Sequence, residues 1–405
     1  MLSKFAKIAL SLAALLWAAP SQSCTVALVS ARASATGRPL LWKNRDSGTQ
    51  DTKVARVDSR DGSHAYVAVF NASDRDCREA WTGFNDVGFA IMNSASYNLK
   101  DDNVPASEMD REGLVMALAL SSCVTVDDFE RLLSELPRPL GVEANFGVID
   151  ASGQGAFFET DNDSWTRYNL SEAADGILIR TNYSHSGRPG EGYGFTREAN
   201  AEKLLRPYAR TGSVSPELLT SSLSCSWLNT TLDRDFSDCR GFVPDRDFIP
   251  RYTTSSTVVV EGCGPTADTD PVVLKGLARD YIMWTALGYP PVAEIFPVWI
   301  DSVPEPLLGT AANGAAPASN EAKARRDKAF HRPGGEKEMY VDLGVLYNDR
   351  ATGLAQTIGK LNRSTYERFS KRRSLKSTGS SLKSTGSSLK STGSSLNTRK
   401  QTQKP

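Results

Sequence analysis

Short apolar and alternating runs follow one another along most of the chain and predict a mixture of strands and helices. Small and β-branched residues at 25–33 predict a strand, and Gly37-Arg-Pro39 predicts a turn. Residues 40–44 predict a second strand that pairs back on the first as a hairpin. Further strands are predicted at 65–70, 88–94, 146–150, 155–159, 176–181 and 255–261, and helices at 111–122, 126–136, 196–208 and 215–223.

These predicted elements come in blocks, without the regular strand–helix–strand alternation of a parallel sheet. Blocks of this kind favour an α+β fold with two antiparallel sheets and helices on the outside. The composition, 40% hydrophobic and 23% charged, is typical of a soluble globular protein. The length of 405 residues suggests two or three domains, although one large layered domain fits equally well.

The N-terminal residues have the pattern of a secretory signal. Two lysines precede an apolar run at 8–17 that is too short to span a bilayer comfortably. Ser21 and Ser23 provide the small side chains that cleavage just before Cys24 needs, although a cut two residues earlier, leaving a Gln-Ser stub, also fits. We therefore expect residues 1–23 to be a signal peptide and the protein to be exported, either periplasmic or secreted.

The C-terminal residues differ in composition from the rest. A seven-residue unit, Ser-Leu-Lys-Ser-Thr-Gly-Ser, starts at Ser374 and occurs three times in succession. One leucine per unit cannot build a coiled-coil seam, so we expect a disordered basic tail at 371–405 and a catalytic domain at 24–370.

The overall net charge of zero conceals an acidic body. The tail carries nine Lys or Arg and no acid, and the leader carries two lysines and no acid, which leaves residues 24–370 at about −11. An acidic body argues against nucleic acid as a partner. No later run reaches 18 apolar residues, so we expect no membrane span, whereas a homo-oligomer remains possible.

Cys24 combines two properties that matter together: it lies at the expected cleavage site and it opens a strand. As the first residue of a mature chain it would carry a free α-amine with a pKa of about 8, suited to act as a base near neutral pH. A thiol beside its own amine needs no separate histidine. The three histidines lie in polar contexts and form no spaced pair typical of a metal site.

Lys43-Asn-Arg-Asp46 follows 19 to 22 residues after Cys24. In the predicted hairpin, the end of the second strand lies beside the start of the first, so Lys43 and Asp46 would lie near the new terminus. A carboxylate there can orient the amine, and a cation can favour the thiolate. A surface ion pair at a hairpin end is the alternative interpretation of this stretch.

At Cys24-Thr and Leu41-Trp-Lys-Asn-Arg-Asp46 the sequence resembles the opening of the cysteine-type N-terminal nucleophile (Ntn) amide hydrolases. That superfamily includes choloylglycine (bile salt) hydrolases, penicillin V acylases, acid ceramidase-like enzymes, the isopenicillin N acyltransferase group and related dipeptidases. Lys43 stands where many members carry arginine, which keeps the charge but loses the planar fork. Later stretches that also resemble the superfamily are Gly83-Phe-Asn-Asp-Val-Gly88 leading to Asn93, Asn145 to Gly153 with Glu159, Arg180-Thr-Asn182, Ser256-Thr-Val258, and Trp284 to Pro290.

The resemblance implies a four-layer αββα sandwich that works without a metal or a cofactor. It implies that Cys24 is the nucleophile, that Asn182 and Asn93 hold the oxyanion, and that Asp46 and Lys43 fix and tune the terminus. A distal positive charge of the kind bile salt hydrolases use has no secure counterpart from the sequence, although Arg251 is a candidate.

The function expected from these residues is hydrolysis of a linear amide in a small acyl substrate through a thioester. Transfer of the acyl group to an amine acceptor on the same fold remains open. Two other classes of protein are also compatible: a lipid-anchored binding protein with an acylated Cys24, and a non-catalytic exported scaffold. The substrate stays undefined among bile amides, acylated amino acids, penicillins, acyl homoserine lactones and dipeptides.

Export to an oxidising compartment would allow disulfides among the six cysteines. Cys225 and Cys239 enclose a short polar loop, so we expect a bridge between them, whereas the other pairings remain open.

Overall fold

The computed structural model describes residues 23–99, 103–334 and 338–371. The expected signal peptide lies outside these ranges except for Ser23, and the repeats of the expected tail lie outside them altogether, so both remain predictions. The chain divides into two compact units, Met1–Gly359 and Lys360–Pro405, and everything below concerns the first. The described part of the second unit is helical.

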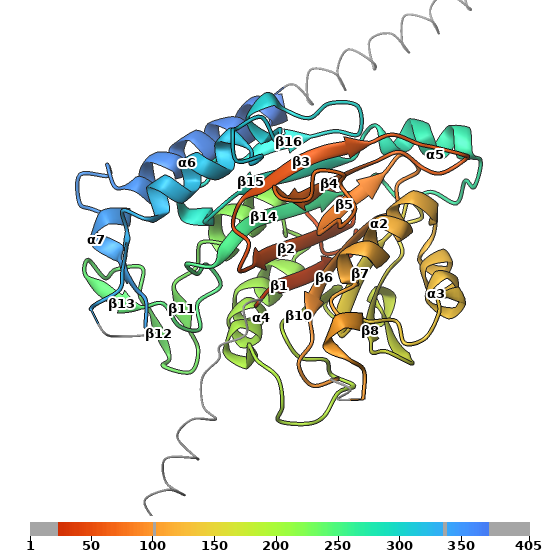
Figure 1. The fold of residues 1–405 in the computed structure, drawn as a ribbon. Helices are drawn as coiled ribbons and strands as arrows, with labels where there is room; N and C mark the ends of the chain where they lie inside the picture. The colour runs from red at the N-terminus through yellow and green to blue at the C-terminus, as the bar shows by residue number, and fades with distance from the viewer. Residues whose placement is uncertain (1–22, 100–102, 335–337, 372–405) are drawn as a thin grey trace, which may run out of the picture. The chain divides into compact units, whose positions relative to one another are not determined.

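Two antiparallel sheets form the centre of the first unit (Figure 1). The six-stranded sheet has the order β10 (Ile177–Arg180), β1 (Thr25–Val29), β2 (Leu40–Asp46), β14 (Thr254–Glu261), β15 (Ile282–Leu287) and β16 (Phe296–Val298). The seven-stranded sheet follows the chain in order: β3 (Thr52–Val57), β4 (Tyr66–Asn71), β5 (Thr82–Asn85), β6 (Ala90–Ala95), β7 (Ala144–Ile149), β8 (Gly155–Thr160) and β9 (Trp165–Asn169).

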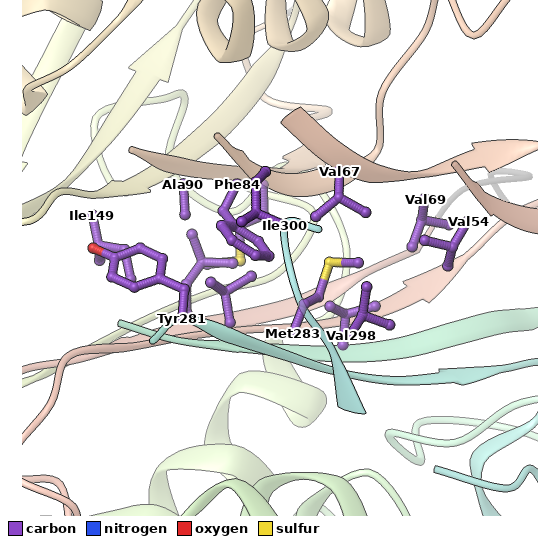
Figure 2. Packing of buried hydrophobic residues seen from close by; sticks show 14 of the residues in the cluster. Val54, Val67, Val69, Phe84, Ala90, Ile149, Tyr281, Met283, Val298 and Ile300 are labelled. Carbon is purple, nitrogen blue, oxygen red and sulfur yellow. The ribbon is translucent and has the colours of Figure 1, made fainter. Parts of the chain in front are cut away.

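The two sheets pack face to face over one apolar core, and strand alternation decides which side chains enter it. On β4, Val67 and Val69 point into this core, whereas Tyr66, Ala68 and Phe70 belong to a second core on the other face. Figure 2 shows the inter-sheet side chains, contributed by strands of both sheets. Because successive residues face opposite layers and both layers are buried, these strands are nearly continuous apolar runs.

Helices cover the outer faces. α2 (Glu112–Ser122) and α3 (Val126–Glu135) pack on the seven-stranded sheet, and α3 begins with the capping box expected at Thr125. α4 (Phe195–Arg210) and the π-helical segment η3 (Leu218–Leu223) pack against the six-stranded sheet. The expected α+β architecture of two antiparallel sheets between helices is therefore confirmed. The remaining helices are α5 (Pro271–Ala278), α6 (Pro317–Arg326) and α7 (Leu343–Leu346), with short turns η1 (Ala106–Glu108), η2 (Leu170–Glu172), η4 (Pro290–Val292) and η5 (Glu305–Leu307).

Five further short strands form two small sheets: β11 (Leu228–Asn229) with β12 (Arg234–Asp235), and β18 (Tyr340–Asp342) between β13 (Phe242–Pro244) and β17 (Phe330–His331). No helix among the described residues is long and apolar enough to cross a membrane.

The N-terminal hairpin forms as expected around Gly37, whose φ of +66° suits a glycine in the turn. Its register pairs Thr25 with Asn44 and Val26 with Lys43, so the start of β1 lies beside the end of β2. β1 ends at Val29, earlier than expected, because residues 30–33 form a hydrogen-bonded turn.

The disulfide expected between Cys225 and Cys239 does not form, since both thiols are free. The Cys225 thiol donates to the carbonyl oxygen of Thr220 at 3.7 Å. The Cys239 sulfur instead accepts from Arg234 at 3.3 Å. Each sulfur is therefore engaged by its own local segment, and loop length alone was an insufficient guide.

Candidate active site

Cys24 lies immediately before β1, in the interior of the six-stranded sheet between β10 and β2. Its side chain is buried and belongs to the inter-sheet core. Its thiol donates to the carbonyl oxygen of Asp46 at 3.8 Å, across the open end of the hairpin. The nucleophile candidate thus directly precedes a strand that is paired on both sides, which suits a reacting group that must be placed rigidly.

Asp46, the last residue of β2, is almost completely buried, and both of its carboxylate oxygens accept hydrogen bonds. Both the Nε and an Nη of Arg251 donate to its Oδ2, at 2.9 and 2.8 Å, and the hydroxyl of Thr254 donates to its Oδ1 at 2.6 Å. A carboxylate bound in this way has a fixed orientation. Arg251, a candidate whose counterpart in the family could not be assigned from the sequence, is therefore part of the site.

Lys43 reaches from β2 to the seven-stranded sheet. Its Nζ donates to the Oδ1 of Asn93 on β6 at 2.6 Å and to the carbonyl oxygen of Trp81 at 2.9 Å. Lys43 pairs with Val26, and Cys24 precedes Val26 by two residues, so the backbone pattern places both side chains on the same face of the sheet. Burial lowers the pKa of Lys43 to about 7, and the nearby Cys24 opposes this shift only in part.

Asn182 follows β10 and is completely buried. Its Nδ2 donates to the carbonyl oxygen of Ala95 at 2.9 Å, and its Oδ1 accepts from Arg197 at 2.8 Å. Its backbone pairs with Tyr193 through two hydrogen bonds. The side-chain amide is consequently anchored to both sheets and to α4.

Hydrogen bonds link the five residues predicted from the sequence in pairs near the start of β1 and the end of β2, with Asn93 reaching Lys43 from β6 of the other sheet. Cys24 contacts the backbone of Asp46, and Lys43 contacts Asn93. Asn182 connects to Cys24 through Arg197, whose Nη1 donates to the Cys24 carbonyl oxygen at 2.6 Å.

Sequence reasoning missed Arg197 altogether. Helical periodicity identified its helix, but it gave no sign that this arginine would point toward Cys24. It is one of four basic residues on a polar helix that starts about 170 residues after Cys24 in the chain. Only the packing of α4 on β1 and β10 places it there.

The site contains thiol, amine, carboxylate, amide and guanidinium groups. No group of three or more His, Cys, Asp or Glu that could hold a metal ion occurs among the described residues. The chemistry that this arrangement can perform with its own side chains is nucleophilic attack by sulfur at a site lined with hydrogen-bond donors.

No protein-family model and no curated protein matches the chain. Similar solved structures include an N-acylethanolamine-hydrolyzing acid amidase ortholog from Caenorhabditis elegans, with 15% identity, 65% of this chain and 99% of that chain covered, and a TM-score of 0.41. A mutant conjugated bile acid hydrolase from Clostridium perfringens is 12% identical, with a TM-score of 0.41; the match covers 70% of this chain and 93% of that chain. Penicillin V acylase from Agrobacterium tumefaciens is 11% identical, with a TM-score of 0.34; the match covers 69% of this chain and 87% of that chain. These are the kinds of enzyme that the motifs at Cys24 and Asp46 resemble, but at such identities and TM-scores they add no weight to the site's own geometry.

Replacing Lys43 with methionine is expected to change how stability depends on pH. The unfolded chain holds the Lys43 proton up to about pH 10, whereas the folded chain holds it only below about pH 7. In this window folding releases a proton, so the wild-type free energy of unfolding should rise with pH. Relative to Lys43→Met, we expect a rise of about 2 kcal/mol between pH 7 and pH 9.

Urea titrations of both proteins across this pH range measure the difference. Lys275→Met is the control, because the Lys275 side chain is half exposed and pairs with Asp86 on the surface. Parallel stability curves for wild type and Lys43→Met would show that Lys43 keeps its proton in the folded protein.

Proposed function

We propose that this chain is an exported hydrolase of linear amide bonds that uses Cys24 as an N-terminal nucleophile. One observation supports this above all: the Cys24 thiol contacts the backbone of Asp46, whose carboxylate is bound by Arg251 and Thr254. A buried lysine bonded to Asn93 lies on the same face of the sheet, and Asn182 is linked to the Cys24 carbonyl through one arginine. A structural cysteine would need none of these groups.

The reaction is acyl transfer from an amine to water. The Cys24 sulfur attacks the amide carbonyl carbon while its α-amine takes the thiol proton. Asn182 and Asn93 donate to the oxyanion of the tetrahedral intermediate. The C–N bond then breaks, the α-amine delivers the proton to the leaving amine, and a thioester remains on Cys24. Water attacks the thioester, releases the carboxylic acid and restores the thiol.

This mechanism requires removal of the residues before Cys24. In the unprocessed chain Cys24 still follows Ser23, and its nitrogen is an amide without a basic lone pair. The small residues at Ser21 and Ser23 support cleavage and export together, because a secretory signal is removed at such a site. Once the α-amine is free, the carboxylate of Asp46 is the proposed group that orients it.

Intact mass and N-terminal sequencing of the exported protein, followed by a screen of fluorogenic amides, test this proposal. An unmodified terminal Cys24 with amine release from at least one N-acyl substrate is the expected result. A lipid on Cys24 would instead identify an anchored binding protein, and a retained upstream segment would exclude the terminal amine as the base. Adding a primary amine to the assay separates acyl transfer from hydrolysis, because transfer yields a new amide.

Removing the side-chain donor of Asn182 should slow the chemical step without weakening substrate binding. Loss of one oxyanion donor typically lowers kcat by about 10²- to 10³-fold. Asn182→Asp is the matched variant, because it keeps the size and an oxygen for Arg197 but has no amide hydrogen. We expect Asn182→Ala and Asn182→Asp to lower kcat similarly in steady-state assays, with KM changed little. A rise in KM at constant kcat would place Asn182 in substrate binding instead.

A further inference from the structure

Arg197 makes four hydrogen bonds around the nucleophile, and its side chain is almost completely buried. Besides the Cys24 carbonyl, its Nη1 donates to the Thr25 hydroxyl at 3.0 Å and to the Ser23 carbonyl oxygen at 3.2 Å, the last a contact that the proposed cleavage before Cys24 would remove. Its Nη2 donates to the Oδ1 of Asn182 at 2.8 Å. One guanidinium therefore binds both the strand that carries the nucleophile and the proposed oxyanion donor.

These four acceptors are neutral oxygens. Within the described ranges no carboxylate lies at ion-pair distance from Arg197, although other buried arginines, such as Arg180 with Glu159, have one. Burial lowers the pKa of Arg197 to about 10, so the group remains charged at neutral pH. Because a buried charge without a counter-ion is costly, fold stability alone gives little reason to keep this arginine here.

A guanidinium has only donors, so it can hydrogen-bond to the Asn182 amide only when Oδ1 points toward it. The Nδ2 must then face the opposite way, where one of its hydrogens is bonded to Ala95. An amide has two such hydrogens, which leaves one for the substrate. Without Arg197 the amide could turn over and present an acceptor to the oxyanion, which would destabilise the intermediate.

We propose that Arg197 is a positioning residue that fixes the Asn182 amide with its nitrogen toward the reaction centre and couples it to the backbone of Cys24. This inference rests on the proposed function and adds a residue that acts through Asn182. It predicts that the effect of removing Arg197 depends on whether Asn182 is present.

The test is a double-mutant cycle between Arg197→Met and Asn182→Ala, with Arg197→Lys as the conservative variant. Arg206→Met is the control on the same helix, because Arg206 pairs with Asp175 and Glu202 at the surface, away from Cys24. We expect Arg197→Met to lower kcat about 10- to 100-fold with KM changed less than about threefold, and Arg197→Lys to recover part of this loss. In the Asn182→Ala background, the same substitution should lower kcat less than about threefold.

Two further measurements keep the result interpretable. Alkylation of Cys24 by iodoacetamide needs no oxyanion donor, so Arg197→Met should retain its rate within about threefold if the protein is folded. In asparagine-labelled protein, the side-chain NH₂ resonances of Asn182 should shift or broaden in Arg197→Met without any substrate present. Full additivity in the cycle, or unchanged NH₂ resonances, would overturn the inference.

Failure of the proposed function would look different. In that case wild type itself would release no amine, while the Asn182 resonances would still report on the contact with Arg197.

Discussion

Replacing Cys24 with alanine is expected to abolish amide hydrolysis, a loss of at least about 10⁴-fold in kcat. The sulfur is the only group proposed to form a bond with the substrate, so no other residue of the site can substitute for it. Removing the nucleophile from an acyl-transfer enzyme leaves only the slow residual rate that binding and oxyanion donors provide. Cys24→Ser should retain slightly more activity, because a hydroxyl can attack but is a weaker nucleophile than a thiol near neutral pH.

Mass spectrometry of acid-quenched wild-type reactions should show the acyl group on the peptide that begins with Cys24. Cys123→Ala is the matched control: Cys123 is also buried, but burial raises the pKa of its thiol to about 12, so it is unreactive. That variant should hydrolyse amides at the wild-type rate. Turnover by a correctly processed Cys24→Ala protein would rule out the thioester mechanism.

The sequence was sufficient for those parts of the site that depend on local pairing. A glycine turn between two apolar strands sets the hairpin register, and this register alone brings Lys43 and Asp46 to the start of β1. The same reasoning located β7 and β8 and the capped start of α3, because turn and cap residues act over a few positions.

Contacts between distant segments could not be predicted in the same way. Arg251 lies on an irregular segment before β14, and its contact with Asp46 depends on the pairing of β14 with β2 across about 200 residues. Arg197 depends on how α4 packs across β1 and β10. Neither arginine belongs to a motif, so the sequence offered Arg251 only as an unaligned candidate; an arginine on a helix is normally exposed to solvent, so Arg197 is revealed by the tertiary structure.

Burial explains why these charged residues are informative. Lys43, Asp46 and Arg197 each have at most 2% of their surface exposed, a degree of burial that is rare for charged residues unless they are paired. Asp46 is paired with Arg251, whereas Lys43 and Arg197 bond mainly to neutral oxygens. Burying these charged side chains removes them from water, which costs folding free energy. Chemistry at Cys24 therefore explains the cluster better than a contribution to fold stability does.

Replacing Asp46 with asparagine is expected to reduce both stability and activity, and the two losses should be separable. The substitution leaves Arg251 without its carboxylate. Breaking a buried pair by removing one partner costs about 3–5 kcal/mol, and we expect the lower end because 21% of the Arg251 side chain remains exposed. Urea unfolding at neutral pH measures this loss.

The activity loss has a different origin and should persist when the stability is restored. Adding Arg251→Met to Asp46→Asn removes the unpaired charge, so the double variant should regain about 2 kcal/mol of the lost stability. It should not regain turnover, because neither asparagine nor methionine can orient a terminal ammonium as a carboxylate does; we expect kcat to stay about 10²-fold below wild type. Recovery of kcat together with stability would mean that Asp46 only maintains the fold at the end of β2. A persistent loss of activity in a stable protein would instead support its proposed role beside the α-amine of Cys24.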